Sequence, residues 1–215
     1  MIINEVTSIF IAIIIAYLLG SIPFAYIFTR MATGKDIRQL GSGNAGGNNV
    51  FREVGLRAAI PTAFFDVGKG ALAVAIAHWL LGVPLHEPEL FVLLAAVAAI
   101  AGHMWSVYLK FRGGNGLSAT IGALAILMPW ELLIVIGLVL ILKVVTHNLV
   151  LSVNISLLSV PISAWFLERS WLLVGFSIIV ALLLILNFIP TAKAAFAKAG
   201  GRKNLSDELL RREKR

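Results

Sequence analysis

The stretch Gly41–Arg52 carries the residue types in this chain that are best suited to binding a small charged molecule. It contains four glycines, three asparagines, one serine and one arginine, and it is nearly free of apolar residues before Val50. Glycines let the backbone turn sharply and direct N–H groups inward, and the side chains add donors with almost no acidic group among them. This pattern predicts a site for phosphate or another small anion, with a flexible loop as the alternative. The expected contacts are Ser42, Gly43, Asn44, Asn48, Asn49 and Arg52.

A second glycine-rich segment, Lys110–Gly116, reads Lys-Phe-Arg-Gly-Gly-Asn-Gly. It again places cations beside glycines, and His103 stands near the end of the apolar run before it. A lone histidine at such a place is often only an interfacial residue, but the nearby glycine turn favours a role in a site. We therefore expect His103 and Asn115 to be catalytic groups. The expected substrate contacts in this segment are Arg112, Gly113, Gly114 and Gly116.

Asp66 and Lys69 are three residues apart in an apolar run, so they share one face of a helix. Charged groups within a membrane span are costly and usually face a polar interior. The two residues form either a structural ion pair or part of a site. Lys69 is the candidate catalytic cation, whereas Asp66 and Gly70 are candidates for either role.

Several familiar site patterns are absent or out of context. The glycines of Gly41–Gly46 match the dinucleotide-binding fingerprint as a string, but no predicted strand precedes them in a βαβ unit. No Gly-Lys-Ser/Thr closes the loop as in a Walker motif, and no histidine begins the His-x4-Asp dyad of soluble acyltransferases. The chain has no cysteine, which excludes disulfides, thiolate metal sites and cysteine nucleophiles. We expect neither a metal nor a cofactor.

The composition is that of an integral membrane protein. Apolar residues make up 59% of the 215 residues and charged residues 13%, against roughly 25% charged residues in a soluble domain. The first apolar run lacks a basic n-region and a small-residue cleavage site, so it predicts a retained membrane helix. The formal net charge of +7 fits cytoplasmic segments that face anionic lipid. No nucleic-acid partner is expected.

Four membrane spans are predicted from apolar runs at Val6–Phe28, Ala58–Leu81, Leu90–Leu109 and Trp171–Ile189. A kink is expected near Pro23 in the first span, because proline cannot donate a helical hydrogen bond. The polar segment Arg30–Arg57 is expected to be a loop.

Between Leu117 and Leu167 the nearly continuous apolar sequence fits either two or three crossings. Three crossings require a short first helix, Leu117–Met128, which at 1.5 Å per residue covers about 18 of the roughly 30 Å of a bilayer core. The eight basic residues after the last span lie in the cytoplasm with three crossings and outside with two. Because basic residues favour the cytoplasmic side, we expect three crossings, with Glu131 on the outer side.

The sequence thus predicts an all-α integral membrane protein with about seven transmembrane helices and a short half-helix after the second glycine-rich segment. The N-terminus is expected outside and the C-terminus inside, so both glycine-rich segments lie on the cytoplasmic face. Residues 1–190 are expected to form a single membrane domain, and residues 191–215 a basic cytoplasmic tail.

Three groups of motifs occur in order between about residue 15 and residue 125. The first group is Gly20–Phe24, Asp36–Arg38, Gly41–Asn44, Asn49–Val50 and Arg52. The second is Asp66 with Lys69–Gly70, and the third is Gly102–His103, Val107–Tyr108, Phe111 and Gly113–Gly116. Together they closely resemble a bacterial membrane family, the acyl-phosphate-dependent glycerol-3-phosphate acyltransferases called PlsY.

The resemblance implies transfer of an acyl chain from acyl-phosphate to the sn-1 hydroxyl of glycerol 3-phosphate. The product would be lysophosphatidate, made for phospholipid biosynthesis at the cytoplasmic face of the cell membrane. The implied partners are the two substrates and membrane lipid, with the oligomeric state left open and a monomer as the simplest case. Because acyl-phosphate has a good leaving group, catalysis could rest on positioning and charge stabilisation. A substrate phosphate or His103 would accept the hydroxyl proton.

The chain departs from the family pattern at four places. Asn48 replaces a threonine, Asn115 replaces a lysine and Ser106 replaces a proline, and the polar stretch expected after the last span is not recognisable around Asn187–Lys198. A divergent relative that acylates another phosphorylated or polyol acceptor is therefore the main alternative. A small anion transporter and a non-catalytic lipid-binding relative are the others.

Overall fold

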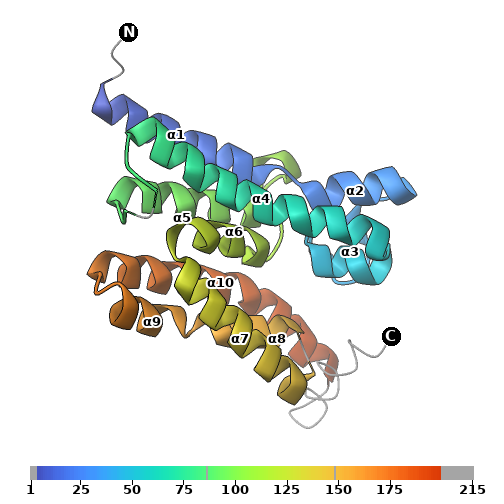
Figure 1. Cartoon of the computed structure of the whole chain (residues 1–215). Coiled ribbons are helices and arrows are strands. Elements are labelled where there is room, and N and C mark those ends of the chain that lie inside the picture. Colours follow the sequence, from blue (N-terminus) through green and yellow to red (C-terminus); the bar gives the residue numbers. More distant parts are fainter. Residues whose placement is uncertain (1–3, 86, 148, 200–215) are drawn as a thin grey trace. The chain divides into compact units, whose positions relative to one another are not determined.

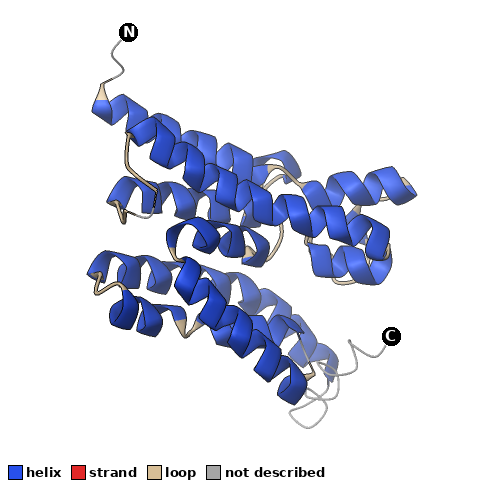
Figure 2. Cartoon of the chain, viewed as in Figure 1, coloured by secondary structure: helices blue, strands red, loops and turns tan. Residues whose placement is uncertain are grey.

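The computed structural model describes residues 4–85, 87–147 and 149–199, and every regular element within them is a helix (Figure 2). The expected all-α class is therefore confirmed. Figure 1 labels the α-helices, and two 3₁₀ turns, η1 and η2, lie among them. In chain order the elements are α1 Glu5–Ser21, α2 Phe24–Thr33, η1 Ile37–Gln39, α3 Gly47–Glu53, α4 Leu56–Leu81, α5 Leu90–Met104, η2 Val107–Leu109, α6 Leu117–Leu127, α7 Pro129–Thr146, α8 Leu149–Leu157, α9 Val160–Leu167 and α10 Trp171–Ala199.

Two compact units divide the chain, Met1–Met128 and Pro129–Arg215. The first unit contains α1 to α6 and every candidate site residue, and the second contains α7 to α10. The single membrane domain expected over residues 1–190 stays a prediction. The last helix continues to Ala199, and residues 200–215 of the expected tail lie outside the described residues.

In the first unit, α1 packs against α5 with their backbones close together. A Cβ atom on Gly20 of α1 would overlap the carbonyl oxygen of Ala99, and one on Gly102 of α5 would overlap the carbonyl oxygen of Tyr17. Lipid gives apolar helices little drive to associate, so small residues that permit close contact determine which faces meet. The two reciprocal glycine contacts therefore define the α1–α5 interface.

A second reciprocal pair joins α4 to α6. A Cβ atom on Gly70 of α4 would overlap the carbonyl oxygen of Ala119, and one on Gly122 of α6 would overlap the carbonyl oxygen of Val67. Gly70 was a candidate for a structural or a site role, and the structure places it in this contact. The short helix α6 thereby brings the end of the second glycine-rich segment against the middle of α4.

The kink expected in the first span is a full break, because α1 ends at Ser21 and α2 begins at Phe24. Pro23 lies in the break and has no N–H group to continue the hydrogen-bond ladder. The last carbonyl groups of a helix lack intrahelical partners, and inside a membrane they need other donors. Ser106, which follows α5, donates its hydroxyl to the carbonyl oxygen of Ser21 at 2.6 Å.

The expectation of a loop over Arg30–Arg57 is wrong for part of that segment. Helix α2 continues to Thr33, and η1 and α3 occupy Ile37–Gln39 and Gly47–Glu53. The reason is a small apolar core that residues of this segment form with residues outside it, and in which Val50 is fully buried. The buried members of this core are Ala25, Ile37, Ala45, Val50, Ala58, Ala59 and Leu109.

Four helical segments of the described residues are long and apolar enough to cross a membrane: Glu5–Thr33, Leu56–Leu81, Leu90–Leu109 and Pro129–Thr146. Three shorter apolar segments complete the order expected from the sequence: Leu117–Leu127, Leu151–Leu167 and Trp171–Asn187. The short half-helix after the second glycine-rich segment is confirmed as α6, with 11 residues. The number of these segments that cross the bilayer, and their orientation, stay predictions.

In the second unit, α7 packs against α8 and α9 packs against α10. The ring centroids of Trp165 and Trp171 lie 4.3 Å apart, and the two residues stand on either side of the turn between α9 and α10. Glu131, expected on the outer side between two spans, lies in the first turn of α7 with a buried side chain. An acidic group there interacts favourably with the positive N-terminal end of the helix dipole.

The glycine contact between α4 and α6 generates a stability prediction. Gly122→Ala should lower the free energy of unfolding by about 1–3 kcal/mol, because the added methyl group overlaps the Val67 carbonyl oxygen. Gly68→Ala on α4 is the matched control, since open space surrounds that position. It should leave stability unchanged or raise it by up to about 1 kcal/mol. Thermal unfolding in detergent measures both variants, and equal midpoints for Gly122→Ala and wild type would contradict the prediction.

Candidate active site

Asn49 organises the first glycine-rich loop from within. Its side-chain amide group donates to the carbonyl oxygens of Ile37, Leu40 and Asn44 at 3.3, 3.0 and 3.0 Å. Its Oδ1 atom accepts a hydrogen bond from the backbone N–H of Ser42 at 3.1 Å. The Asn49 side chain is buried, and both its amide nitrogen and its oxygen are bonded to backbone groups. In the structure it therefore holds the loop in its conformation. An anion would meet other groups of this loop first.

Several donors of the first loop have exposed side chains. Ser42, Asn48 and Arg52 are exposed, and Asn44 is half-buried. Asn48 and Arg52 lie four residues apart on α3, so they share one face of that helix. This face offers an amide and a guanidinium together, which is a suitable pairing for a phosphate group. Gly43 permits the preceding turn, with a φ of 75°.

The second glycine-rich segment folds back onto the end of α5. The backbone N–H groups of Gly113 and Gly114 donate to the carbonyl oxygens of Met104 and His103 at 3.0 and 2.9 Å. These glycines therefore cap the helix with their N–H groups, and their missing side chains allow the close approach. A Cβ atom on Gly114 would overlap Nε2 of His103, so this segment lies directly on the imidazole ring.

The two glycine-rich segments lie beside each other in the first unit. The backbone N–H of Ala45 donates to the carbonyl oxygen of Gly113 at 3.4 Å. From the same stretch of chain, Nη1 of Arg38 donates to the carbonyl oxygen of Leu109 at 3.0 Å. The structure thus brings together segments that are about 70 residues apart in the chain. The sequence predicted a shared face of the membrane but not this contact.

A buried polar cluster lies where α4 and α5 meet the break between α1 and α2. Nζ of Lys69 pairs with Oδ1 of Asp66 at 2.7 Å and donates to the carbonyl oxygen of Ile22 at 2.8 Å. Two of its three donor positions are therefore engaged inside the protein. Nδ1 of His103 lies 3.6 Å from Oδ1 of Asp66. All three side chains are nearly inaccessible to solvent, so they form a linked buried unit.

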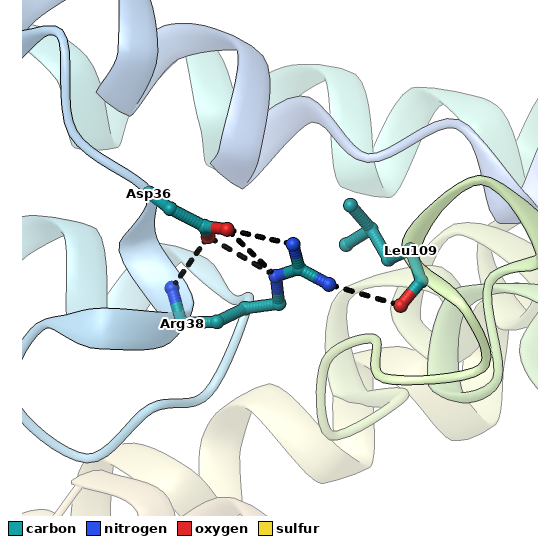
Figure 3. A network of polar contacts seen from close by, with 3 residues as sticks. All are labelled: Asp36, Arg38 and Leu109. Carbon is teal, nitrogen blue, oxygen red and sulfur yellow. Dashed lines mark hydrogen bonds and ion pairs between the residues drawn. The ribbon is translucent and has the colours of Figure 1, made fainter.

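Asp36 and Arg38 form an ion pair just before the first glycine-rich loop (Figure 3). The two closest atoms, Arg38 Nη2 and Asp36 Oδ2, are 2.6 Å apart. Hydrogen bonds from Arg38 hold the pKa of the Asp36 carboxyl below its usual range, and the carboxylate in turn raises the pKa of the arginine. Both groups are therefore charged at neutral pH. In the sequence, these two residues stand out only as part of a motif.

The remaining predicted residues border this region. Arg112 is exposed and Asn115 is half-buried, and Gly116 precedes α6 with a φ of 85°. In the part of the chain that the structure describes, no three histidine, cysteine, aspartate or glutamate side chains gather as metal ligands would. Sequence reasoning missed Arg38 and gave Ser106 no site role. Their contacts with distant parts of the chain run to the backbone carbonyl groups of Leu109 and Ser21, which carry no signal in the sequence.

Known proteins resemble this chain over nearly its whole length. Residues 10–198 match a family model described as glycerol-3-phosphate acyltransferase. Glycerol-3-phosphate acyltransferases 1 and 2 of Dehalococcoides mccartyi (strain ATCC BAA-2266 / KCTC 15142 / 195) are 39% and 41% identical to it. The alignments cover 94% and 96% of this chain and 93% and 100% of those relatives.

A solved structure has the same fold. It is a crystal structure of PlsY, an integral membrane glycerol 3-phosphate acyltransferase, in its glycerol 3-phosphate form. The TM-score is 0.79 with 25% sequence identity, over 89% of this chain and 93% of that one. A second form of PlsY, with lysophosphatidic acid, aligns with a TM-score of 0.76 at 24% identity over the same shares of both chains.

Proposed function

The chain belongs to the glycerol-3-phosphate acyltransferase family, and on that premise we propose that it transfers an acyl chain from acyl-phosphate to the sn-1 hydroxyl of glycerol 3-phosphate. The product is lysophosphatidate, a precursor of membrane phospholipids. We place the reaction at the cytoplasmic face of the cell membrane. A relative of the same fold is known in a glycerol 3-phosphate form, which supports the acceptor.

The observation that carries the proposal is the contact between the two glycine-rich segments. Ala45 and Gly113 are joined through their backbones, and exposed donors stand on both segments, including Arg52 on the first and Arg112 on the second. Both proposed substrates carry phosphate. A site for them needs two sets of donors close together, so that acceptor hydroxyl and acyl carbonyl meet in a fixed geometry.

The reaction needs little from the protein beyond positioning. The sn-1 hydroxyl oxygen attacks the acyl carbonyl carbon and forms an ester bond, while the bond from that carbon to the phosphate oxygen breaks. Inorganic phosphate leaves with the electron pair and is a good leaving group, so no covalent protein intermediate is required. Donors aimed at the developing negative charge would supply the rest of the acceleration.

The hydroxyl proton goes either to a phosphate oxygen of a substrate or to His103. His103 is 4% exposed, and Gly114 covers its Nε2 atom. This burial favours the substrate phosphate as the acceptor of the proton. In this proposal His103, with Asp66 and Lys69 beside it, helps to position the second glycine-rich segment. Asn115 contributes an amide donor from that segment.

A direct assay tests the donor and the acceptor together. Protein purified in detergent is given acyl-phosphate, acyl-coenzyme A or acylated acyl carrier protein, each with glycerol 3-phosphate, and the products are read by mass spectrometry. Lysophosphatidate formed with acyl-phosphate alone is the expected result. Product formation only with a thioester donor would overturn the proposed donor.

The exposed arginine of α3 gives a test of the anion site. Arg52→Ala should remove a charge-assisted hydrogen bond worth roughly 1.5–3 kcal/mol, which is about 10- to 150-fold in kcat/KM. Arg57→Ala is the matched control, because Arg57 is also exposed and lies just beyond α3. A folded Arg52→Ala protein with unchanged kcat/KM would remove Arg52 from the site.

The proposed orientation can be tested directly, because the native chain has no cysteine. Single cysteines at Ser42, Glu87 and Ser206 are treated with a membrane-impermeant thiol reagent on intact cells. We expect Glu87→Cys to react from outside, and Ser42→Cys and Ser206→Cys to react only after lysis. Reaction of Ser42→Cys in intact cells would invert the orientation.

The second candidate function is acylation of a less charged acceptor, and Asn115 is the residue that favours it. An amide can donate to phosphate but does not neutralise it. Arg112 stands three residues away and could supply the missing charge. If the protein instead acylates glycerol 3-phosphate through a weakened phosphate site, as we propose, Asn115→Lys adds a cation beside the phosphate. The variant should then have a lower KM for glycerol 3-phosphate, and high salt should reduce this gain by screening the charge.

The control for this variant is Asn115→Gln, which keeps the amide and should bring no such gain. Wild type and the Asn115→Lys and Arg112→Ala variants are compared by kcat/KM for glycerol 3-phosphate and for a neutral polyol. A wild type that is inert towards glycerol 3-phosphate, together with an Arg112→Ala variant of full activity on the polyol, would establish the second candidate instead.

A further inference from the structure

The guanidinium of Arg38 is held on two sides by groups from different parts of the chain (Figure 3). On one side, Nε donates to both carboxylate oxygens of Asp36 at 3.1 Å, and Nη2 donates to Oδ2 at 2.6 Å. On the other side, Nη1 donates to the carbonyl oxygen of Leu109 at 3.0 Å. A planar fork of donors can satisfy a carboxylate and a carbonyl at once, whereas a lysine ammonium is a single point charge.

The backbone around Arg38 is bonded to the first glycine-rich loop, Gly41–Arg52. Asn49 donates to the carbonyl oxygens of Ile37 and Leu40, which lie on either side of Arg38 in η1 and its end. A Cβ atom on Gly43 would approach the carbonyl oxygen of Arg38 at 3.3 Å. The backbone of Arg38 is therefore held against the loop that carries Ser42 and Asn44.

Leu109, the partner of the guanidinium, ends η2 directly before the second glycine-rich segment. Its side chain is buried in the same apolar core as Ile37, so the carbonyl group is held in place. After it, Lys110 and Phe111 have φ values of 53° and 61°, a left-handed turn that starts the segment. A bond to the Leu109 carbonyl oxygen thus acts at the point where the segment begins.

We propose that Arg38 is a positioning residue that locks the first glycine-rich loop to the base of the second segment and thereby fixes the spacing of the phosphate-binding groups. The inference rests on the proposed function of these loops. The backbone contact from Ala45 to Gly113 is long for a hydrogen bond at 3.4 Å. The charge-assisted bond from Arg38 is shorter and stronger.

A local surface ion pair would be the simpler role for Asp36 and Arg38. Exposed pairs between near neighbours add little to stability. However, the bond to Leu109 spans 71 positions of the chain, and the Arg38 side chain is only 28% exposed. Asp36 then serves to hold the guanidinium in the orientation that reaches Leu109. The two roles differ in whether loss of Arg38 changes the distance between the loops.

Spin labels measure that distance. Cysteines replace the exposed residues Ser42 and Arg112, one on each segment, and double electron–electron resonance gives the distance distribution in detergent. We expect Arg38→Met to broaden the distribution and Lys35→Met, which removes an exposed cation of the same stretch, to leave it narrow. An unchanged distribution in a folded Arg38→Met protein would overturn the proposal.

Kinetics of the unlabelled protein give the second readout. Arg38→Met should raise the KM for glycerol 3-phosphate on the order of tenfold with a smaller fall in kcat, because the groups are intact but misplaced. If this variant does not fold, Asp36→Asn keeps the arginine and removes its orienting carboxylate, and it should shift both readouts in the same direction. Wild-type kinetics and distances in a folded Asp36→Asn protein would then overturn the proposal.

Failure of the proposed function can be told apart from failure of this inference. A wild type that is inert towards glycerol 3-phosphate would contradict the proposed function, while the distances between the spin labels would still test the link between the loops.

Discussion

The break after α1 is the constraint on which the rest of the first unit depends. A helix that stops within an apolar environment exposes carbonyl oxygens that lipid cannot satisfy. Here the carbonyl oxygens of Ser21 and Ile22 accept hydrogen bonds from two other parts of the chain. The donors are the hydroxyl of Ser106, which follows α5, and the ammonium of Lys69 in α4. These bonds hold α4 and the end of α5 at the break, so both glycine-rich segments emerge close to one place.

The ammonium at the break requires a counter-charge, because an isolated ion is very costly in a low-dielectric interior. Asp66 supplies it from one helical turn away, and His103 lies beside the same carboxylate. The sequence left open whether Asp66 and Lys69 form a structural ion pair or part of a site. The structure shows the ion pair, and a site role for these residues stays a prediction. The charges of Lys69 and Asp66 are engaged with each other, whereas the donors Ser42, Arg52 and Arg112 of the two glycine-rich segments are exposed.

Much of the fold was predictable from the sequence because its signals are local. The apolar runs, the proline at the break and the short run after Gly116 each act over a few residues, and each led to a feature that the structure has. The loop expected over Arg30–Arg57 was wrong because Val50 and Ile37 pack against Leu109, which comes from far along the chain. Composition indicates that a segment is polar but not that its few apolar residues will meet a distant one.

For the candidate site, residue types and motif order alone were enough to identify the family and to name the candidate site residues. Only the tertiary structure showed which of the candidate residues are exposed and which bond to the backbone of the protein itself. Asn49 and the N–H groups of Gly113 and Gly114 bond to carbonyl groups of the protein itself, and Arg38 reaches the carbonyl oxygen of Leu109. The physical reason is that every residue has a carbonyl group, so a side chain's backbone partner leaves no mark in the sequence and depends on how the helices pack.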